Sequence, residues 1–420
     1  MREGGARMPE GPALNESGVL AGEGRNLRVE LLRALAVIAV FFQHVDNLPS
    51  EPEGWAAFAR RANFTNGVDL FFCISGFVIA KSWWEAREKY PREHVGAWRF
   101  LGAFAVRRAF RLLPASWVWL LLCVVAFGWY VRELPNTQPR LVAEGALAAF
   151  LNVSNLYWAG WTSAMSGVKW PNPDTVGIWY TLSMEEQFYL LFALSAMWLP
   201  RRVMLWVFAA AVIGQFAVLR THFQWASVLR TDAFMLGVLV QAWSGTEWWR
   251  QRVLPWVRMP VVSVVLVLGA VVMLFWGARW VDLRGWTFGT GLAALAAGVL
   301  VVWASAELRE RGERVGVAVR ALTRSFAWVG GLSYGIYLTH LLVMAVVFES
   351  CVRGGWLSVR GTAGGTMTAW EFAVYVVVAG VGTGVCAWVS YGVVESPLRR
   401  WGRELSDGML RRGMEGTRSR

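Results

Sequence analysis

Cysteine is scarce in this sequence, and the N-terminal segment lacks the apolar core of a signal peptide. Only four of the 420 residues are cysteines, none of them forms a CxxC pair, and three lie inside apolar runs. The sequence therefore predicts neither a disulfide framework nor a zinc site, and we expect no metal in the protein. Residues 1–26 are polar and rich in Gly, Glu, Arg and Pro, which predicts a disordered cytoplasmic tail rather than a cleaved leader.

Acidic residues are few relative to basic ones. The chain carries 29 Asp and Glu against 41 Lys and Arg, a formal net charge of +12. A nucleic-acid-binding protein could show this balance, but 56% of the residues are apolar and the mean hydropathy is +0.40. Apolar runs recur along almost the whole chain, which predicts an integral membrane protein whose cytoplasmic loops hold the excess Lys and Arg. We therefore expect membrane lipids as partners and no nucleic acid.

A helix that crosses the membrane needs about 20 mostly apolar residues, and several runs approach this length. The ten strongest cover residues 29–47, 67–84, 112–131, 178–199, 203–220, 227–243, 260–276, 286–304, 328–349 and 371–393. An eleventh run, 141–158, is weaker because it contains Glu144, Asn152 and Asn155. If this run does not cross, the predicted inner segments hold 30 of the 41 Lys and Arg residues, as the positive-inside rule requires.

The sequence thus predicts an all-α integral membrane protein of the cell membrane. We expect a polytopic bundle of about ten transmembrane helices plus one interfacial or re-entrant helix, with both termini cytoplasmic. Residues 27–402 form the predicted membrane domain, and residues 403–420 a basic cytoplasmic tail.

Ionisable side chains recur at a similar depth, in the outer half of five predicted helices. They are His44, Asp69, Glu185, Glu186, Arg230, Asp232 and His340. Such groups are costly in lipid and face the bundle interior or water, so their common level predicts a polar cavity open toward the outer face. Tyr337 shares a helix face with His340, and the sequence leaves open whether it serves a site or interhelical packing.

Basic residues mark the inner ends of the first and third predicted spans. Arg33 begins the first span, and Arg108 and Arg111, three residues apart, share one face of the helix that leads into the third. Two guanidinium groups on one face can bind phosphates, although ordinary positive-inside residues show the same pattern. Arg33 and His44 are eleven residues apart. This spacing places them on nearly the same helix face, about 16 Å from each other, where they can line one channel.

Six stretches of the chain match the motifs of a known family. They are "LRVELLRALAVIAVFFQHV", "GVDLFFCISGFVIA", "RRAFRLLPA", "WYTLSMEEQFYLL", "SYGIYLTHLLV" and "VVESPLRR", in this order between residues 27 and 402. With them the sequence resembles the acyltransferase 3 family of integral-membrane O-acyltransferases. The resemblance implies a ten-helix domain that uses cytoplasmic acyl-CoA to modify an acceptor hydroxyl, often on a surface polysaccharide. One departure is mild: the family's Trp-Ser before the glutamate motif reads Trp179-Tyr180-Thr181 here.

The resemblance also implies a donor site. The family's arginine-x10-histidine pattern begins at Arg33, and its Arg-x-x-Arg pattern falls on Arg108 and Arg111. These three arginines would bind the phosphates of acyl-CoA, which we expect as a donor substrate and not as a resident cofactor.

The catalytic residues implied by the resemblance are His44, Glu185 and Asp69. Imidazole titrates near neutral pH, so His44 would deprotonate the acceptor hydroxyl or briefly carry the acyl group. Glu185 or Asp69 would orient the imidazole, as the acid of a catalytic triad does. Direct transfer and a two-step relay both remain open.

The acceptor is expected to be a carbohydrate or a lipid-linked glycan, and the acyl group is expected to be acetyl. An acyltransferase that modifies a small lipophilic metabolite such as a macrolide is an alternative. A proton-coupled transporter or flippase is another, because acids at midlevel can form a proton relay. The residues expected to contact the acceptor or support the catalytic groups are Glu186, Arg230, Asp232, Tyr337 and His340.

Overall fold

The computed structural model describes residues 26–45, 51–131, 139–164, 176–218, 225, 230–306, 317–357 and 367–418. Every regular element in these ranges is helical, which confirms the predicted all-α class. The predicted disordered tail, apart from its last residue, lies outside the described residues.

The longer helices are α1 (Leu27–Val45), α3 (Gly67–Lys89), α4 (Ala97–Trp129), α5 (Pro139–Phe150), α6 (Ser154–Ala164), α7 (Trp179–Trp198), α8 (Arg201–Gln215), α10 (Asp232–Ser244), α12 (Pro260–Val272), α14 (Gly289–Ser305), α15 (Val317–Gly331), α16 (Ser333–Arg353), α17 (Ala369–Ser390) and α18 (Ser396–Arg418). The short elements are α2 (Glu53–Ala59), η1 (Phe64–Asn66), α11 (Leu254–Arg258), α13 (Ala278–Leu283) and the π-helical turns η3 (Trp249–Val253), η4 (Met273–Gly277) and η5 (Tyr391–Glu395).

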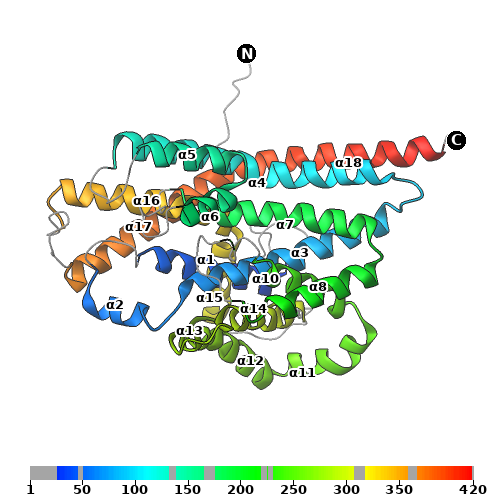
Figure 1. Cartoon of the computed structure of the whole chain (residues 1–420), viewed down its shortest axis with the longest axis horizontal. Helices are drawn as coiled ribbons and strands as arrows, with labels where there is room; N and C mark the ends of the chain where they lie inside the picture. The colour runs from blue at the N-terminus through cyan, green and yellow to red at the C-terminus, as the bar shows by residue number, and fades with distance from the viewer. Residues whose placement is uncertain are drawn as a thin grey trace, which may run out of the picture.

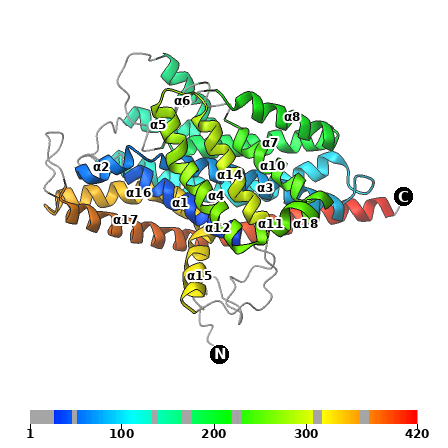
Figure 2. The same cartoon turned by 90° about the horizontal axis from the view of Figure 1, so that it is seen from below.

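Helix α1 lies in the middle of the bundle. Most of the long helices run along the long axis of the molecule (Figure 1), whereas α15 runs across them and points away from the bundle (Figure 2). Helix α1 packs against α3, α14, α15 and α16, so its apolar residues are buried on several sides. The predicted residues Arg33 and His44 are therefore carried by an interior helix.

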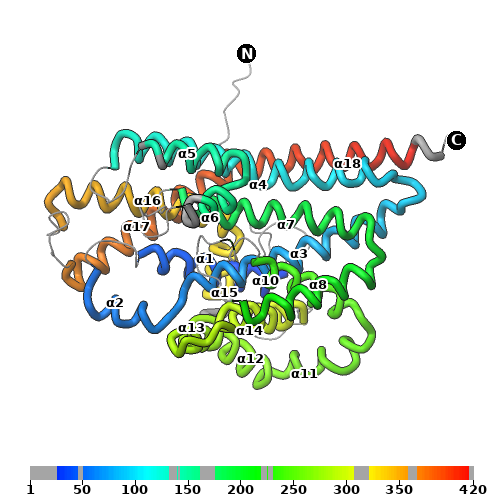
Figure 3. Tube along the Cα trace, in the orientation of Figure 1, coloured from blue at the N-terminus to red at the C-terminus, as the bar shows by residue number. Residues whose placement is uncertain are grey.

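The most extensive helix contact joins α3 and α10, which lie together at the centre of the trace (Figure 3). Two glycines make the close approach possible. A Cβ at Gly76 of α3 would clash with the backbone of Phe234, and a Cβ at Gly237 of α10 would clash with the backbone of Cys73. Small residues at a crossing let two backbones come close together, as is common between membrane helices.

The prediction of about ten transmembrane helices is supported only in part. By length and composition, the helices suited to cross a membrane in the described residues are Phe64–Lys89, Ala97–Trp129, Pro260–Leu283, Ser333–Arg353 and Ala369–Glu415. Three other predicted spans correspond to shorter helices, namely α8, α10 and α14. Helices α1 and α7 have 19 and 20 residues but carry acidic or basic side chains that lower their apolar character. The chain is a multi-pass membrane protein with several apolar helices.

The weak run 141–158 is not one helix. It divides into α5 and α6, which are 12 and 11 residues long and too short to cross a bilayer. The break lies at Asn152, whose φ of 56° is in the left-handed region that Asn tolerates. Gln187 of α7 donates to the Asn152 carbonyl oxygen at 3.0 Å and accepts from Asn155 at 2.8 Å. Two of the three polar residues that weakened the prediction, Asn152 and Asn155, thus fix this turn to α7.

Residues 403–418, predicted as a basic tail, belong to helix α18. This helix runs beside the first half of α4 (Figure 1). Its buried residues Gly402, Ser406, Leu410 and Gly413 recur every three or four positions, which is one helix face. The sequence did not predict a helix here, because the high charge of the segment concealed this face.

Candidate active site

His44 and His340 meet inside the bundle. His44 is the second-last residue of α1, and His340 lies in the first half of α16, with 1% of its surface exposed. The two rings are 4.8 Å apart between centroids, and Nε2 of His340 is 3.2 Å from Nδ1 of His44. The structure therefore brings together two residues that the sequence placed at a similar depth.

Backbone carbonyls determine which nitrogens carry protons. Nδ1 of His44 is 2.8 Å from the carbonyl oxygen of Val40, and Nδ1 of His340 is 2.7 Å from that of Tyr337. A carbonyl oxygen only accepts, so each Nδ1 carries the proton, and Nε2 of a neutral His340 is an acceptor. The single Nδ1 proton of His44 therefore lies between two acceptors, the Val40 carbonyl oxygen at 2.8 Å and Nε2 of His340 at 3.2 Å. Nε2 of His44 is then left unprotonated, and no hydrogen bond to it is found in the described part of the chain.

Tyr337 connects the histidine pair to the start of α7. Its ring centroid is 5.7 Å from that of His340. Its hydroxyl hydrogen-bonds to the hydroxyl of Thr181 and lies 3.3 Å from the carbonyl oxygen of Ile178. Thr181 is part of the Trp-Tyr-Thr sequence that differs from the family pattern. This departure therefore keeps a hydroxyl beside Tyr337.

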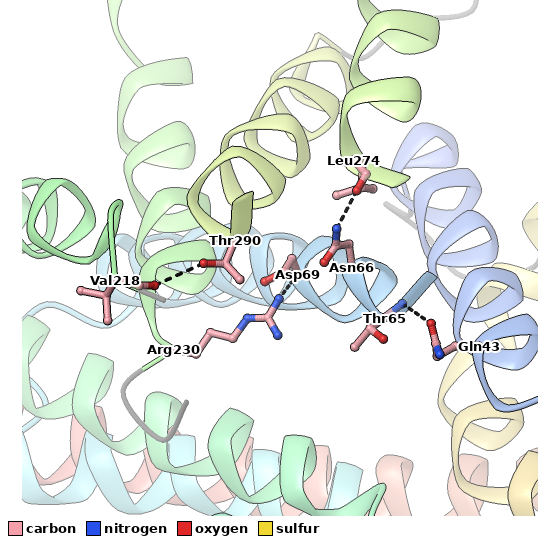
Figure 4. Close-up of polar contacts among 8 residues, drawn as sticks. All are labelled: Gln43, Thr65, Asn66, Asp69, Val218, Arg230, Leu274 and Thr290. Atoms are coloured by element: carbon pink, nitrogen blue, oxygen red, sulfur yellow. Dashed lines mark hydrogen bonds and ion pairs between the residues drawn. The ribbon is translucent and has the colours of Figure 1, made fainter. Parts of the chain in front are cut away.

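The predicted pairing of His44 with a carboxylate is not found among the described contacts. Asp69 forms a buried ion pair with Arg230 instead, which lies just before α10 (Figure 4). The sequence predicts that Arg230 contacts the acceptor or supports the catalytic groups, and it does not predict this pairing. Asp232, the first residue of α10, is buried, with 2% of its surface exposed.

Side-chain contacts fasten the same end of α3 to its neighbours. Gln43 of α1, next to His44 in sequence, accepts from the backbone N–H of Thr65 at 3.0 Å. Asn66 donates to the carbonyl oxygen of Leu274 at 2.7 Å. These contacts appear beside the Asp69–Arg230 pair in Figure 4. They fix α3 relative to α1, and so help to hold the position of Asp69.

Glu185, the other predicted partner of His44, hydrogen-bonds to side chains of α3 and of its own helix. It accepts from the hydroxyl of Ser75 at 2.7 Å and from the hydroxyl of Tyr189. Glu185 thus lies at the contact between α3 and α7, whereas His44 lies between α1 and α16. The neighbouring acid, Glu186, is partly exposed.

Arg108 lies over the ring of Tyr189, the residue that donates to Glu185. Its guanidinium carbon is 5.0 Å from the ring centroid of Tyr189, and its Nη2 donates to the hydroxyl of Ser82 at 3.0 Å. Arg108 interacts electrostatically with the carboxylate of Glu185 and with the guanidinium group of Arg111. We call Ser75, Ser82, Arg108, Glu185 and Tyr189 the arginine cluster. It combines two hydroxyl groups of α3, the guanidinium group of α4, and a carboxylate and an aromatic ring of α7.

Comparison with known proteins now decides the family. The family model described as acyltransferase domain, acyltransferase 3, matches residues 26–392 of the chain. The chain belongs to the acyltransferase 3 family. The resemblance inferred from the six sequence stretches is confirmed.

Several curated proteins are similar to this acyltransferase 3 chain. O-acetyltransferase OatA of Staphylococcus aureus is 26% identical over 393 residues, covering 88% of this chain and 57% of that protein. Nodulation protein 10 of Rhizobium leguminosarum is 26% identical over 390 residues, covering 89% of this chain and 93% of that protein. Peptidoglycan O-acetyltransferase OatA of Listeria monocytogenes is 30% identical over 166 residues, covering 39% of this chain and 23% of that protein.

The chain thus spans about a quarter of the Listeria protein and a little over half of the Staphylococcus protein. No solved structure matches the chain.

Glu395 is a buried acid of this acyltransferase 3 chain that sequence reasoning missed. It lies in the π-helical turn η5 with 3% of its surface exposed. Its carboxylate accepts from Ser390 and from Arg399, both at 3.4 Å, and interacts electrostatically with Arg111. The spacing of Glu395 and Arg399, four residues apart in the "VVESPLRR" stretch, was the available signal.

Arg33 has an acidic partner that the sequence analysis did not name. Its Nη1 is 2.8 Å from Oε1 of Glu30, one turn earlier on α1, and Glu30 is 4% exposed. The role of Arg33 in donor binding stays a prediction. The polar cavity also stays a prediction. A groove of about 540 Å³ lies between α8, α10 and α14, but it is apolar and includes no predicted site residue. No cluster of His, Cys, Asp or Glu suited to a metal ion occurs within the described residues.

Proposed function

We propose that this chain is a membrane-bound O-acyltransferase. It moves an acyl group, expected to be acetyl, from cytoplasmic acyl-CoA to a hydroxyl of a cell-surface polysaccharide or glycolipid. Family membership supports the reaction class, and relatives named O-acetyltransferase and peptidoglycan O-acetyltransferase support a carbohydrate acceptor. The observation that carries the proposal is the position of Nδ1 of His44, 2.8 Å from the Val40 carbonyl oxygen and 3.2 Å from Nε2 of His340, which assigns the lone pair of the ring to Nε2.

The proposed chemistry starts with that nitrogen. Nε2 of His44 accepts the proton of the acceptor hydroxyl, whose oxygen attacks the thioester carbonyl carbon. The new ester bond forms, the bond between carbon and sulfur breaks, and the coenzyme A thiolate takes the proton from Nε2. The cost of a transient cation on His44 is reduced because its Nδ1–H is already hydrogen-bonded.

The arginine cluster is suited to the donor. Acyl-CoA carries several phosphates, and guanidinium groups bind phosphate oxygens in pairs. Arg108 is held by Tyr189 and Ser82, and Arg111 lies one turn further along α4. A fixed guanidinium loses less entropy on binding than a free side chain, so the cluster is a preorganised phosphate site.

This mechanism requires a donor site on the inner side and an acceptor on the outer side. We propose that α1, α7, α8, α10 and α14 cross the membrane together with the five more apolar helices, which makes ten spans. Both termini are then cytoplasmic. The distribution of Lys and Arg supports this topology, with 30 of 41 such residues on the proposed inner side.

The test uses purified full-length protein in lipid nanodiscs, with radiolabelled acetyl-CoA and membranes from a host that lacks the gene. We expect label in the glycan fraction, and a fall in the rate of about 10³-fold for His44→Ala, since general base catalysis contributes on this order. The control is His94→Ala, an exposed histidine outside the site, which should act as wild type. Normal labelling by inserted His44→Ala protein would falsify the base assignment. Absence of acetyl transfer by wild type would favour the transporter alternative.

A further inference from the structure

We propose that His340 is the positioning residue for His44. Its unprotonated Nε2 shares the Nδ1 proton of His44 with the carbonyl oxygen of Val40, and together these two acceptors turn the opposite ring nitrogen toward the acceptor hydroxyl. The inference rests on the proposed function, because it assigns His340 the place that an acid holds in a catalytic triad. Its basis is the direct contact between the two rings, 3.2 Å from nitrogen to nitrogen.

Two backbone carbonyl groups fix the ring of His340 at its Nδ1 side. Its Nδ1 lies 2.7 Å from the carbonyl oxygen of Tyr337 and 3.2 Å from that of Ile336. Both oxygens only accept, so the Nδ1 proton stays on His340, and its other nitrogen keeps a lone pair in the neutral ring. An acceptor that contacts one ring nitrogen of a functional histidine helps to set both the tautomer and the orientation of that ring.

A neutral acceptor also fits the position of the pair. His340 is almost completely buried, and an unpaired carboxylate there would carry a large desolvation cost. The acids Asp69 and Glu185 are instead paired with Arg230 and with hydroxyl groups on other helices. An imidazole supplies one acceptor without adding a buried negative charge. Through the hydrogen bond, its lone pair also stabilises the positive charge that His44 gains when it takes a proton.

The proton count is simple in this arrangement. The acceptor's proton moves to Nε2 of His44 and then to the thiolate of the departing coenzyme A. The Nδ1 proton of His44 stays on His44 throughout, hydrogen-bonded to the Val40 carbonyl oxygen and to Nε2 of His340. His340 neither gains nor loses a proton. Its effect on the rate therefore depends on the lone pair at Nε2, which accepts a hydrogen bond, and not on the basicity of the ring.

Two substitutions of His340 distinguish the effect of its hydrogen-bond acceptor from the effect of its ring volume. His340→Gln places a carbonyl oxygen near the position of Nε2, whereas His340→Phe keeps a ring and removes the acceptor. We expect kcat to fall by about 100-fold for His340→Phe and by no more than about tenfold for His340→Gln. Loss of a hydrogen-bond partner of a functional histidine typically lowers activity by about 10- to 100-fold. KM for acetyl-CoA should stay constant in both, because the arginine cluster lies on other helices.

Thr339→Val is the matched control. Thr339 is buried beside His340 on α16, but its hydroxyl lies near the carbonyl oxygens of Ile336 and Thr383. Its kcat should equal that of wild type. Wild-type kcat for His340→Phe would overturn the proposal, and so would an equal loss for His340→Gln and His340→Phe in inserted, folded protein.

A second measurement does not depend on activity. The chain has four histidines, so protein labelled with ¹⁵N-histidine gives few ring signals, and variants assign those of His44 and His340. We expect both rings as the Nδ1–H tautomer in wild type. An Nε2–H tautomer for His340 would contradict the proposal even if the enzyme is active. Full activity of His44→Ala would contradict the proposed function, whatever the tautomer of His340.

Discussion

The histidine pair is held by backbone carbonyls of its own helices, whereas the arginine cluster is held by side chains from three helices. His44 and His340 each direct Nδ1 to a carbonyl oxygen about one turn earlier. Arg108 and Glu185 depend on Tyr189, Ser75 and Ser82. Both regions hold polar side chains inside the bundle, but only the second combines a guanidinium group with a carboxylate.

This difference matches two chemical tasks. A neutral histidine pair provides a base without a buried anion, so changes there should alter the rate of the chemical step. A charged cluster can attract a donor with several phosphates, so changes there should alter its binding. The comparison predicts that kcat and KM respond to different sets of residues.

The largest effect in the arginine cluster is expected for Arg108→Ala. Loss of a charge-assisted hydrogen bond costs about 2 kcal/mol, so KM for acetyl-CoA should rise by about 30-fold. Arg108→Lys should show an intermediate KM, because an ammonium group keeps the charge but not the planar pair of donors. Steady-state kinetics with varied acetyl-CoA measures both. A fall in kcat at constant KM would place Arg108 in the chemical step and remove the distinction between the two regions.

A smaller effect is expected for Tyr189→Phe. This change removes the hydroxyl that donates to Glu185 and keeps the ring beside Arg108. We expect KM for acetyl-CoA to rise about fivefold, from the loss of about 1 kcal/mol in one hydrogen bond. Tyr189→Leu also removes the cation–π contact and should raise KM further. If Tyr189→Phe and Tyr189→Leu have the same KM, the ring does not help to hold Arg108.

The sequence indicated both histidines of the pair, but only Arg108 and Glu185 of the arginine cluster. Apolar length and the depth of polar groups placed His44, His340 and Glu185 in the bundle interior. Spacing fixes which residues share a face of one helix, but not which helices face each other. The sequence therefore assigned an acid to His44, although α1 turns that residue toward α16 and Glu185 turns toward α3.

The helices were predictable where hydropathy was their main signal. All ten predicted spans contain helical residues, while the boundaries and the split of 141–158 depended on local contacts of Asn152 and Asn155. Helix α18 was missed because its buried face consists of small residues such as Gly402 and Gly413. A Cβ at Gly402 would clash with Phe110, so packing against α4, and not hydropathy, determines this face.

The smallest effect is expected for Asp407→Asn, which removes the ion pair between α18 and Arg107 of α4. The two groups are 2.6 Å apart, but their side chains are 42% and 39% exposed. Exposed pairs contribute about 0–1 kcal/mol, so we expect little change in the unfolding temperature and less than about a twofold change in KM for acetyl-CoA. Arg107 is adjacent to Arg108 in sequence, so this pair is the sharpest control for charge near the arginine cluster. If Asp407→Asn raised KM as much as Tyr189→Phe, the contact between α18 and α4 would contribute to donor binding. The donor site would then include α18 in addition to the arginine cluster.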